Sequence, residues 1–306
     1  MIAAAFSAVL VVSSIFAVAT LGLNFGVDFR GGVTIEVADK DPIDTGAVRS
    51  AVDALGLGET KVKEITDFAG SDPSIEVVIE QQDAPAEASA EEDGESAQQA
   101  AAAKVQQALR ELLGDDVVFR KIDVVGPTVS GELIQRGVMA VVITIGMMLL
   151  YIWYRFEWQF SIGAIIALVH DVVITLGMFA VTRLDFSLAI IAAILTIVGY
   201  SMNDTVVVYD RVRENLRKFK KKDLMDLVDL SINETLSRTV MTSLTTLIAL
   251  FALYFLGGEV LRGFTFAMIW GILIGTYSSV FVASPLLLLT GVKRDWSQTG
   301  GAPATP

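Results

Sequence analysis

Six long apolar segments dominate the pattern of hydrophobic and polar positions along the chain. Crossing the roughly 30 Å hydrocarbon core of a bilayer takes about 20 helical residues, and each segment is close to or above that length. The segments lie at 1–23, 134–154, 160–181, 187–209, 239–257 and 264–290. The pattern therefore predicts a polytopic α-helical membrane protein with six transmembrane helices.

The first apolar segment has a second interpretation as a cleavable signal peptide, because Ala17-Val18-Ala19 has the small residues of a cleavage site. The apolar run is long for a signal peptide, however, and no basic residue precedes it. A transmembrane helix is therefore the favoured interpretation. Because the short basic leader expected before such a helix is missing, we expect the native start to lie upstream of Met1.

Residues 24–133, between the first two apolar segments, have the mixed pattern of a water-exposed domain. Alternation with a period of two predicts strands, and a period of 3.6 predicts helices. Strand, helix, strand, strand, helix and strand follow one another at 32–37, 44–55, 61–65, 74–80, 100–113 and 117–125. This βαββαβ order predicts an α+β ferredoxin-like domain. Residues 83–99 are rich in Ala, Glu and Ser and predict a disordered insertion.

Charge is distributed unevenly along the chain. Of the net charge of −12, residues 24–133 contribute −14, from 23 acidic and 9 basic side chains, and the remainder contributes +2. Basic residues concentrate in 210–237, which we interpret as a loop between the fourth and fifth helices. The positive-inside rule places this loop, both termini and the tail 291–306 in the cytoplasm. The acidic domain then lies outside, in the periplasm or its equivalent.

Composition excludes several classes of function. The chain has no cysteine and one histidine, so disulfides, thiolate metal sites and a histidine-based zinc site are not expected. Glycine-containing segments at 25–32 and 125–133 lack the strand-to-helix context of a phosphate-binding loop. The sequence contains no catalytic triad, metal cluster or nucleotide motif. We therefore expect no enzyme, no cofactor, no metal and no nucleic-acid partner.

Ionisable residues within the apolar segments are the candidate functional residues, because charge inside a bilayer is costly and marks ion or proton paths. Asp204 is the leading candidate, with Asn203 beside it and Tyr200 one turn earlier. Arg238 stands at the start of the fifth segment, with Thr242 one turn further along. Because the two helices are antiparallel and these positions have similar depth, we predict an Asp204–Arg238 ion pair that responds to protons.

His170 and Asp171 lie near the middle of the third segment, and two interpretations of this pair remain open. One is a buried hydrogen-bonded pair that fixes packing, and the other is part of a proton route. The basic segment 210–237 also has two interpretations. It is a topology determinant with a solvated helix face, or a surface that binds anionic lipid or a partner.

Three stretches of the chain resemble the SecF family, whose members are the smaller component of bacterial SecD–SecF protein-export complexes. They are Gly199 to Asn215 (GYSMNDTVVVYDRVREN), Thr235 to Thr246 (TLSRTVMTSLTT) and Gly26 to Gly32 (GVDFRGG). The resemblance covers nearly the whole chain and is specific.

This resemblance implies a six-helix half of the resistance-nodulation-division architecture in the bacterial cytoplasmic (inner) membrane. Such a half pairs with SecD, associates with the SecYEG channel and uses the proton motive force to assist late steps of protein export. In the family, the residues that match Asp204 and Arg238 belong to the proton-responsive site. The implied partners are SecD, SecYEG, the translocating preprotein and the lipid bilayer, with YajC and YidC as further candidates.

Two alternatives from other classes remain at this stage. A proton-coupled small-molecule exporter of the same superfamily normally has twelve spans and two large outer domains in one chain, and this chain has half of each. A membrane scaffold without proton coupling would not need Asp204 and Arg238 at matched depth. Replacing each residue singly and following protein export and drug resistance separates these alternatives.

Overall fold

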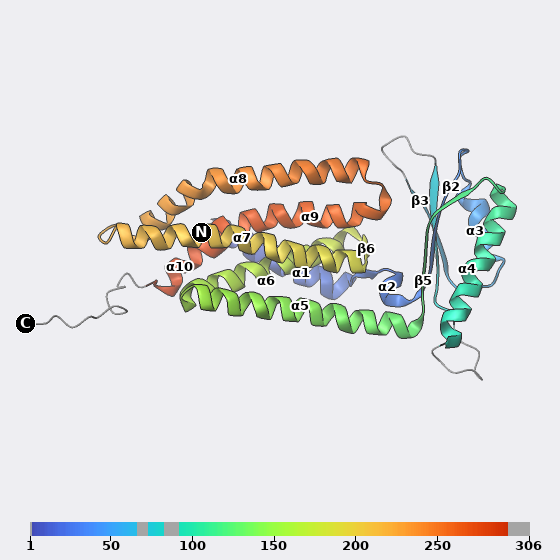
Figure 1. Cartoon of the computed structure of the whole chain (residues 1–306), viewed down its shortest axis with the longest axis horizontal. Coiled ribbons are helices and arrows are strands. Elements are labelled where there is room, and N and C mark those ends of the chain that lie inside the picture. Colours follow the sequence, from blue (N-terminus) through green and yellow to red (C-terminus); the bar gives the residue numbers. More distant parts are fainter. Residues whose placement is uncertain (1, 66–72, 83–91, 293–306) are drawn as a thin grey trace, which may run out of the picture.

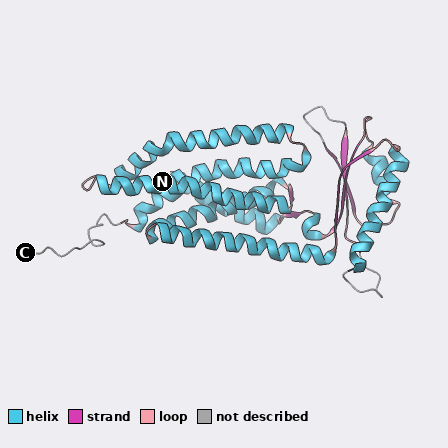
Figure 2. Ribbon diagram, viewed as in Figure 1, coloured by secondary structure: helices cyan, strands magenta, loops and turns pink. Residues whose placement is uncertain are grey.

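The structure is a computed structural model that describes residues 2–65, 73–82 and 92–292. It is an elongated helical bundle with a small domain attached at one end (Figure 1). Helices dominate the chain, and most strand residues lie in the attached domain, which we call the sheet domain, residues 32–125 (Figure 2). The start of α1 and the end of α10 lie toward the opposite end of the bundle (Figure 1).

The bundle confirms the prediction of a polytopic membrane protein. Within the described residues, six helices are long and apolar enough to cross a membrane. The first five are α1 (Ile2–Leu21), α5 (Pro127–Arg155), α6 (Trp158–Thr182), α7 (Leu188–Lys218) and α8 (Leu224–Leu256), and the sixth is formed by α9 (Glu259–Ser278), η1 (Ser279–Ala283) and α10 (Ser284–Thr290). Large apolar side chains cover the outside of the bundle, as a lipid environment requires.

Two helices continue past the apolar segments from which they were predicted. The segment 210–237, interpreted from the sequence as a loop, is helical except between the end of α7 at Lys218 and the start of α8 at Leu224. One face of each extension is apolar and buried, including Leu216 and Leu227. Averaged hydropathy hides such a stripe, because charged residues cover the other faces of the same helices.

A π-helical turn, η1, interrupts the sixth span. Pro285 follows it in the first turn of α10 and lacks the N–H that would bond to the carbonyl four residues earlier, which favours an irregular turn at this point. Hydroxyl groups bond to carbonyls of the turn. Ser284 Oγ donates to the Ser279 carbonyl at 2.8 Å, and the Tyr209 hydroxyl donates to the Ala283 carbonyl at 3.0 Å.

The sheet domain has a four-stranded antiparallel sheet with strand order β3-β4-β2-β5. Its elements follow the order predicted from the sequence: β2 (Gly32–Ala38), α3 (Thr45–Asp53), β3 (Thr60–Ile65), β4 (Ser74–Ile79), α4 (Glu92–Leu113) and β5 (Val118–Val125). Helices α3 and α4 cover the face of the sheet that points away from the bundle (Figure 1). Fully buried Val33, Ile35 and Val37 alternate along β2 and pack in the core with Val105 and Leu109 of α4.

The insertion predicted at 83–99 is divided by the structure. Residues 83–91 lie outside the described residues. Residues 92–99 form the start of α4 rather than a disordered segment. Gln98 is buried and donates from Nε2 to the Gln82 carbonyl at 2.8 Å, so this turn of the helix is tied to the segment that follows β4. Ala, Glu and Gln also favour helices, which explains why their composition misled the prediction.

A short connecting region, which we call the joint and which consists of β1 (Asn24–Phe25), α2 (Val27–Arg30) and β6 (Asp185–Phe186), links the sheet domain to the bundle. β1 pairs in parallel with β6, and α2 follows β1 directly. Asp28 of α2 accepts a hydrogen bond from the backbone N–H of Leu188 at 2.8 Å, at the first residue of α7. Ser187, the N-cap of α7, provides no side-chain cap of its own. Asp28 therefore caps α7 from a distant part of the chain.

Candidate functional site

Asp204 lies in the middle of α7 and is buried between three helices. Its side chain is 9% exposed. Oδ1 accepts from Thr239 Oγ1 of α8 at 2.5 Å, and Oδ2 accepts from Ser279 Oγ of η1. Among the described residues, no ion pair includes Asp204. Hydroxyl groups, rather than a cation, therefore satisfy this carboxyl group.

The predicted ion pair between Asp204 and Arg238 is not formed in the structure. Arg238 is exposed on α8, and its neighbour Thr239 is the residue that contacts Asp204. Successive residues of an α-helix are rotated by about 100°, so a match in depth does not ensure a match in direction. The prediction considered only the depth of the two residues in the membrane. It did not consider the side of α8 to which Arg238 points.

Asp171 of α6 forms the centre of a second buried polar cluster. Its side chain is 1% exposed. Oδ2 accepts from Ser201 Oγ of α7 at 2.5 Å and from Ser278 Oγ of α9 at 2.7 Å. Oδ1 lies 2.9 Å from Nδ1 of His170, whose ring is 5% exposed. The cluster therefore joins three helices through one carboxyl group.

His170 keeps one ring nitrogen without a partner. Nε2 is buried and has no hydrogen bond within the described part of the chain. The ring stacks on Tyr277 of α9, with 6.3 Å between the ring centroids. The Tyr277 hydroxyl donates to the Ala3 carbonyl at 2.9 Å and lies 3.0 Å from Ser7 Oγ of α1. Aromatic and hydroxyl contacts therefore extend the cluster from His170 toward α1.

Two consecutive serines connect the clusters at the point where α9 passes into η1. Ser278 bonds to Asp171, and Ser279 bonds to Asp204. Neither serine was predicted from the sequence, because single hydroxyl residues are common in membrane helices and usually bond to their own backbone. The signal available was a Ser-Ser pair shortly before Pro285, where a regular helix is interrupted.

The other predicted site residues do not join these clusters. Asn203 of α7 is exposed, and so is Thr242 of α8, which lies one turn after the exposed Arg238 and donates to its carbonyl. The Tyr200 hydroxyl makes a long contact of 3.4 Å with Thr246 Oγ1, between these two helices. Lipid offers such side chains no hydrogen bonds, so an exposed polar stripe at membrane depth suits contact with another protein. We call Asn203, Arg238 and Thr242 the exposed polar stripe.

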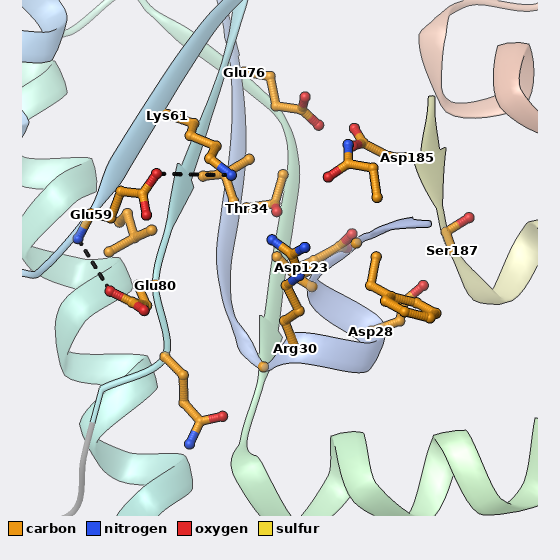
Figure 3. Close-up of a pocket in the computed structure, with 18 of the residues that line it drawn as sticks. Asp28, Arg30, Thr34, Glu59, Lys61, Glu76, Glu80, Asp123, Asp185 and Ser187 are labelled. Atoms are coloured by element: carbon orange, nitrogen blue, oxygen red, sulfur yellow. Dashed lines mark hydrogen bonds and ion pairs between the residues drawn. The ribbon is translucent and has the colours of Figure 1, made fainter. Parts of the chain in front are cut away.

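A cleft of about 1300 Å³ separates the sheet from the joint at the end of the bundle. Side chains of the open sheet face, such as Lys61, Glu76 and Asp123, line it opposite Asp28 and Asp185 (Figure 3). Six acidic and five basic side chains line it in total, so the two signs nearly balance. Because the cleft separates the sheet from the end of the bundle, the sheet domain is connected to α7 mainly through the joint.

Lys121 of β5 illustrates the charge balance within this cleft. Its Nζ lies 2.5 Å from the Asp123 carboxylate. Partial burial lowers the pKa of Lys121, but the hydrogen bond to Asp123 and the nearby carboxylates outweigh burial, so the pKa is raised overall. Lys121 therefore stays charged within the cleft. The described residues contain no group of three or more metal-ligating side chains, here or in the bundle.

Comparisons with known proteins agree on one family. The family described as "Protein export membrane protein SecD/SecF, C-terminal" matches residues 104–293, and the family described as "SecD/SecF GG Motif" matches residues 16–38. The chain is 46% identical to the protein translocase subunit SecF of Cereibacter sphaeroides, over 94% of this chain and 87% of that protein. It is 41% identical to SecF of Vibrio alginolyticus, over 96% and 89%.

Solved structures show the same likeness in three dimensions. The crystal structure of SecDF, a translocon-associated membrane protein from Thermus thermophilus, matches with a TM-score of 0.79 and 35% identity. A SecDF structure in a super-membrane-facing form matches with a TM-score of 0.65 and the same identity. The two matches include 93% and 94% of this chain, respectively, but only 37% of each SecDF chain. It therefore resembles one part of a larger assembly.

Proposed function

The chain belongs to the SecD/SecF family of protein-export membrane proteins, and from this premise we propose that it couples the proton motive force to late steps of protein export. It acts as the SecF-type accessory subunit of a Sec translocase. Asp204 takes up and releases the proton, and Arg238 approaches that site when the helices move.

The observation that carries this proposal is the environment of Asp204. The carboxyl group lies 16 residues from the start of α7, about 24 Å along the helix, which is still within the roughly 30 Å that the hydrocarbon core spans. Burying an ionised carboxylate without a cation costs several kcal/mol, whereas a protonated one is neutral. Hydroxyl partners suit both forms, because Thr239 and Ser279 can each donate to the carboxyl group or accept from it.

The exposed polar stripe supports a SecD-type partner. Asn203, Arg238 and Thr242 lie at membrane depth on the outside of this chain and need protein rather than lipid beside them. The family unites SecD with SecF, and the matched SecDF chains contain further sequence that could supply that surface. Contact with SecYEG is proposed because the matched SecDF of Thermus thermophilus is a translocon-associated membrane protein. YajC and YidC stay predictions from the resemblance.

Charge supports the orientation in which both termini lie in the cytoplasm of a bacterial inner membrane. Arg155 and Lys218 end α5 and α7, which run away from the sheet domain, and Arg211 lies two turns before the end of α7 (Figure 1). Arg155 pairs with Asp210 at 3.1 Å. The sheet domain then lies in the periplasm. We infer a ferredoxin-like fold for it, because strand order β3-β4-β2-β5 with two helices on one face suits a split βαβ arrangement.

Protein uptake into energised membrane vesicles tests the proposal. Asp204→Asn keeps the size and hydrogen bonds of the side chain but cannot titrate, so the part of uptake that an uncoupler removes should disappear. Asp210→Asn is the matched control on the same helix and should retain it. Full retention by Asp204→Asn would favour a scaffold, and loss of drug resistance with normal export would favour a small-molecule exporter.

A further inference from the structure

Asp171 is a second buried carboxyl group close to Asp204 that the proposed function does not use. It accepts from Ser201 of α7, and Ser201 lies three residues before Asp204 on that helix. Three residues correspond to about 4.5 Å along a helix axis, so the two clusters lie at nearly the same depth. Asp171 is nearer to the end of α7 that carries the joint.

Ser278 and Ser279 each have two acceptors within reach. Ser278 Oγ lies 2.7 Å from Asp171 Oδ2 and 3.1 Å from the Gly275 carbonyl. Ser279 Oγ contacts Asp204 Oδ2 and lies 3.0 Å from the Thr276 carbonyl. A hydroxyl has one proton, so each serine donates to one acceptor at a time. Each serine can therefore form a hydrogen bond with its carboxyl group whether that group is protonated or ionised.

The two states differ only in the direction of hydrogen bonds. Beside an ionised carboxylate, the serine donates to the carboxylate. Beside a protonated carboxyl group, the acid O–H donates to the serine oxygen, and the serine hydrogen turns to the backbone carbonyl. No buried polar group loses its partner in either state, so the change avoids the cost of about 1–3 kcal/mol for an unsatisfied group.

The charged and titratable groups around Asp171 are few. On α6 the neighbour is His170, on α7 it is Asp204, and on α9 it is Tyr277, which stacks on the histidine ring. Within the described residues, no lysine or arginine forms an ion pair with either aspartate. Two carboxylates with one imidazole are costly to ionise together at this depth. His170 Nε2, buried and without a hydrogen-bond partner among the described residues, offers a further place for a proton.

We propose that His170 and Asp171 form a second proton-binding site, coupled to Asp204 through the adjacent hydroxyl groups of Ser278 and Ser279. A proton taken up at one carboxyl group changes the hydrogen bonds of the same turn that holds the other. Transfer from one aspartate to the other leaves the net charge of the cluster unchanged, and uptake from water raises it by one. The inference rests on the proposed function of Asp204 and extends it to a pair of sites.

Infrared difference spectroscopy on the full chain with its SecD-type partner in lipid tests the second site. In the wild type, a change of pH should alter the C=O stretching band of protonated carboxyl groups, and the change should have two components, one for each aspartate. Asp171→Asn should remove one component and lower uncoupler-sensitive export at least tenfold, with normal membrane amounts and partner copurification. Asp171→Glu should restore part of both signals. An unchanged band and unchanged export in Asp171→Asn would overturn the inference.

Ser278→Ala provides a second test should Asp171→Asn fail to accumulate. It leaves both carboxyl groups in place and should shift the Asp171 component, whereas Ser161→Ala removes a buried hydroxyl of α6 that bonds to the Glu157 carbonyl and should not. Equal spectra for the two serine variants would contradict the coupling. Asp204→Asn separates the two proposals. If it retains uncoupler-sensitive export, the proposed function fails, and if it alone loses export, only the second site fails.

Discussion

Replacing Asp28 with alanine should loosen the first turn of α7, which carries Asp204 further along. Asp28 Oδ2 accepts from the Leu188 N–H at 2.8 Å, and Ser187 makes no side-chain cap there. Removing a side-chain cap costs about 0.5–2 kcal/mol. Because 1.4 kcal/mol corresponds to a factor of ten in an equilibrium, local opening of this turn should rise by a factor of about 2–30.

Hydrogen exchange measured by mass spectrometry on the membrane-embedded protein reports this opening directly. In Asp28→Ala, peptides that contain Leu188 to Ile191 should exchange about 2–30 times faster. Asp28→Asn keeps an acceptor oxygen and loses only the interaction of its charge with the helix dipole, about 0.3–1 kcal/mol, so it should exchange about two to five times faster.

Asp44→Ala is the matched control for a cap that acts within its own helix. Asp44 accepts from the Gly46 and Ala47 N–H groups at 2.8 and 3.3 Å, so its loss should speed exchange in α3 and leave α7 unchanged. The reasoning is refuted if Asp28→Ala leaves the start of α7 at the wild-type rate while Asp44→Ala accelerates α3. The sheet domain would then be tied to the start of α7 by the short β1–β6 pair and the covalent chain rather than by this cap.

Three further predictions follow from individual contacts. A fragment of residues 31–125 should fold alone, and Gly32→Ala, at φ +118 and with its new carbon against a carbonyl of β4, should lower its stability in urea by at least about 1–3 kcal/mol; unchanged unfolding would contradict this. Arg238→Lys should impair export less than Arg238→Leu, because a point charge partly replaces the guanidinium; equal loss would argue against a charge role. Tyr209→Phe leaves the Ala283 carbonyl without its donor and should lower thermal stability in detergent by about 1–3 kcal/mol, and an unshifted unfolding temperature would contradict that role.

Much of the architecture was predictable because it depends on local patterns. Membrane spans require long apolar runs, and the sheet domain shows clear alternation, so both follow from short stretches of sequence. Asp204 and Asp171 were candidates from the sequence, because carboxyl groups inside apolar segments are rare, and the structure shows both buried. The helical extensions of α7 and α8 escaped prediction, because one apolar stripe is diluted by charge on the other faces.

The contacts that escaped prediction depend on direction or on distant parts of the chain. Thr239, not Arg238, faces Asp204, and a rotation of one residue decides between them. The cap from Asp28 to Leu188 joins positions 160 residues apart, which no local pattern encodes. Ser278 and Ser279 stand where α9 passes into a π-helical turn, and their adjacent side chains bond to two different carboxyl groups on other helices.

Proton flux through the protein tests the central claim most directly. The full chain and its SecD-type partner would be placed in liposomes with a SecYEG channel and a translocating protein, and internal pH followed under an imposed potential, which supplies about 2.3 kcal/mol per proton at 100 mV. Translocation should be accompanied by proton entry in the wild type and in Asp210→Asn, partly in Asp204→Glu, and not in Asp204→Asn. Proton entry at the wild-type rate in Asp204→Asn would contradict the account.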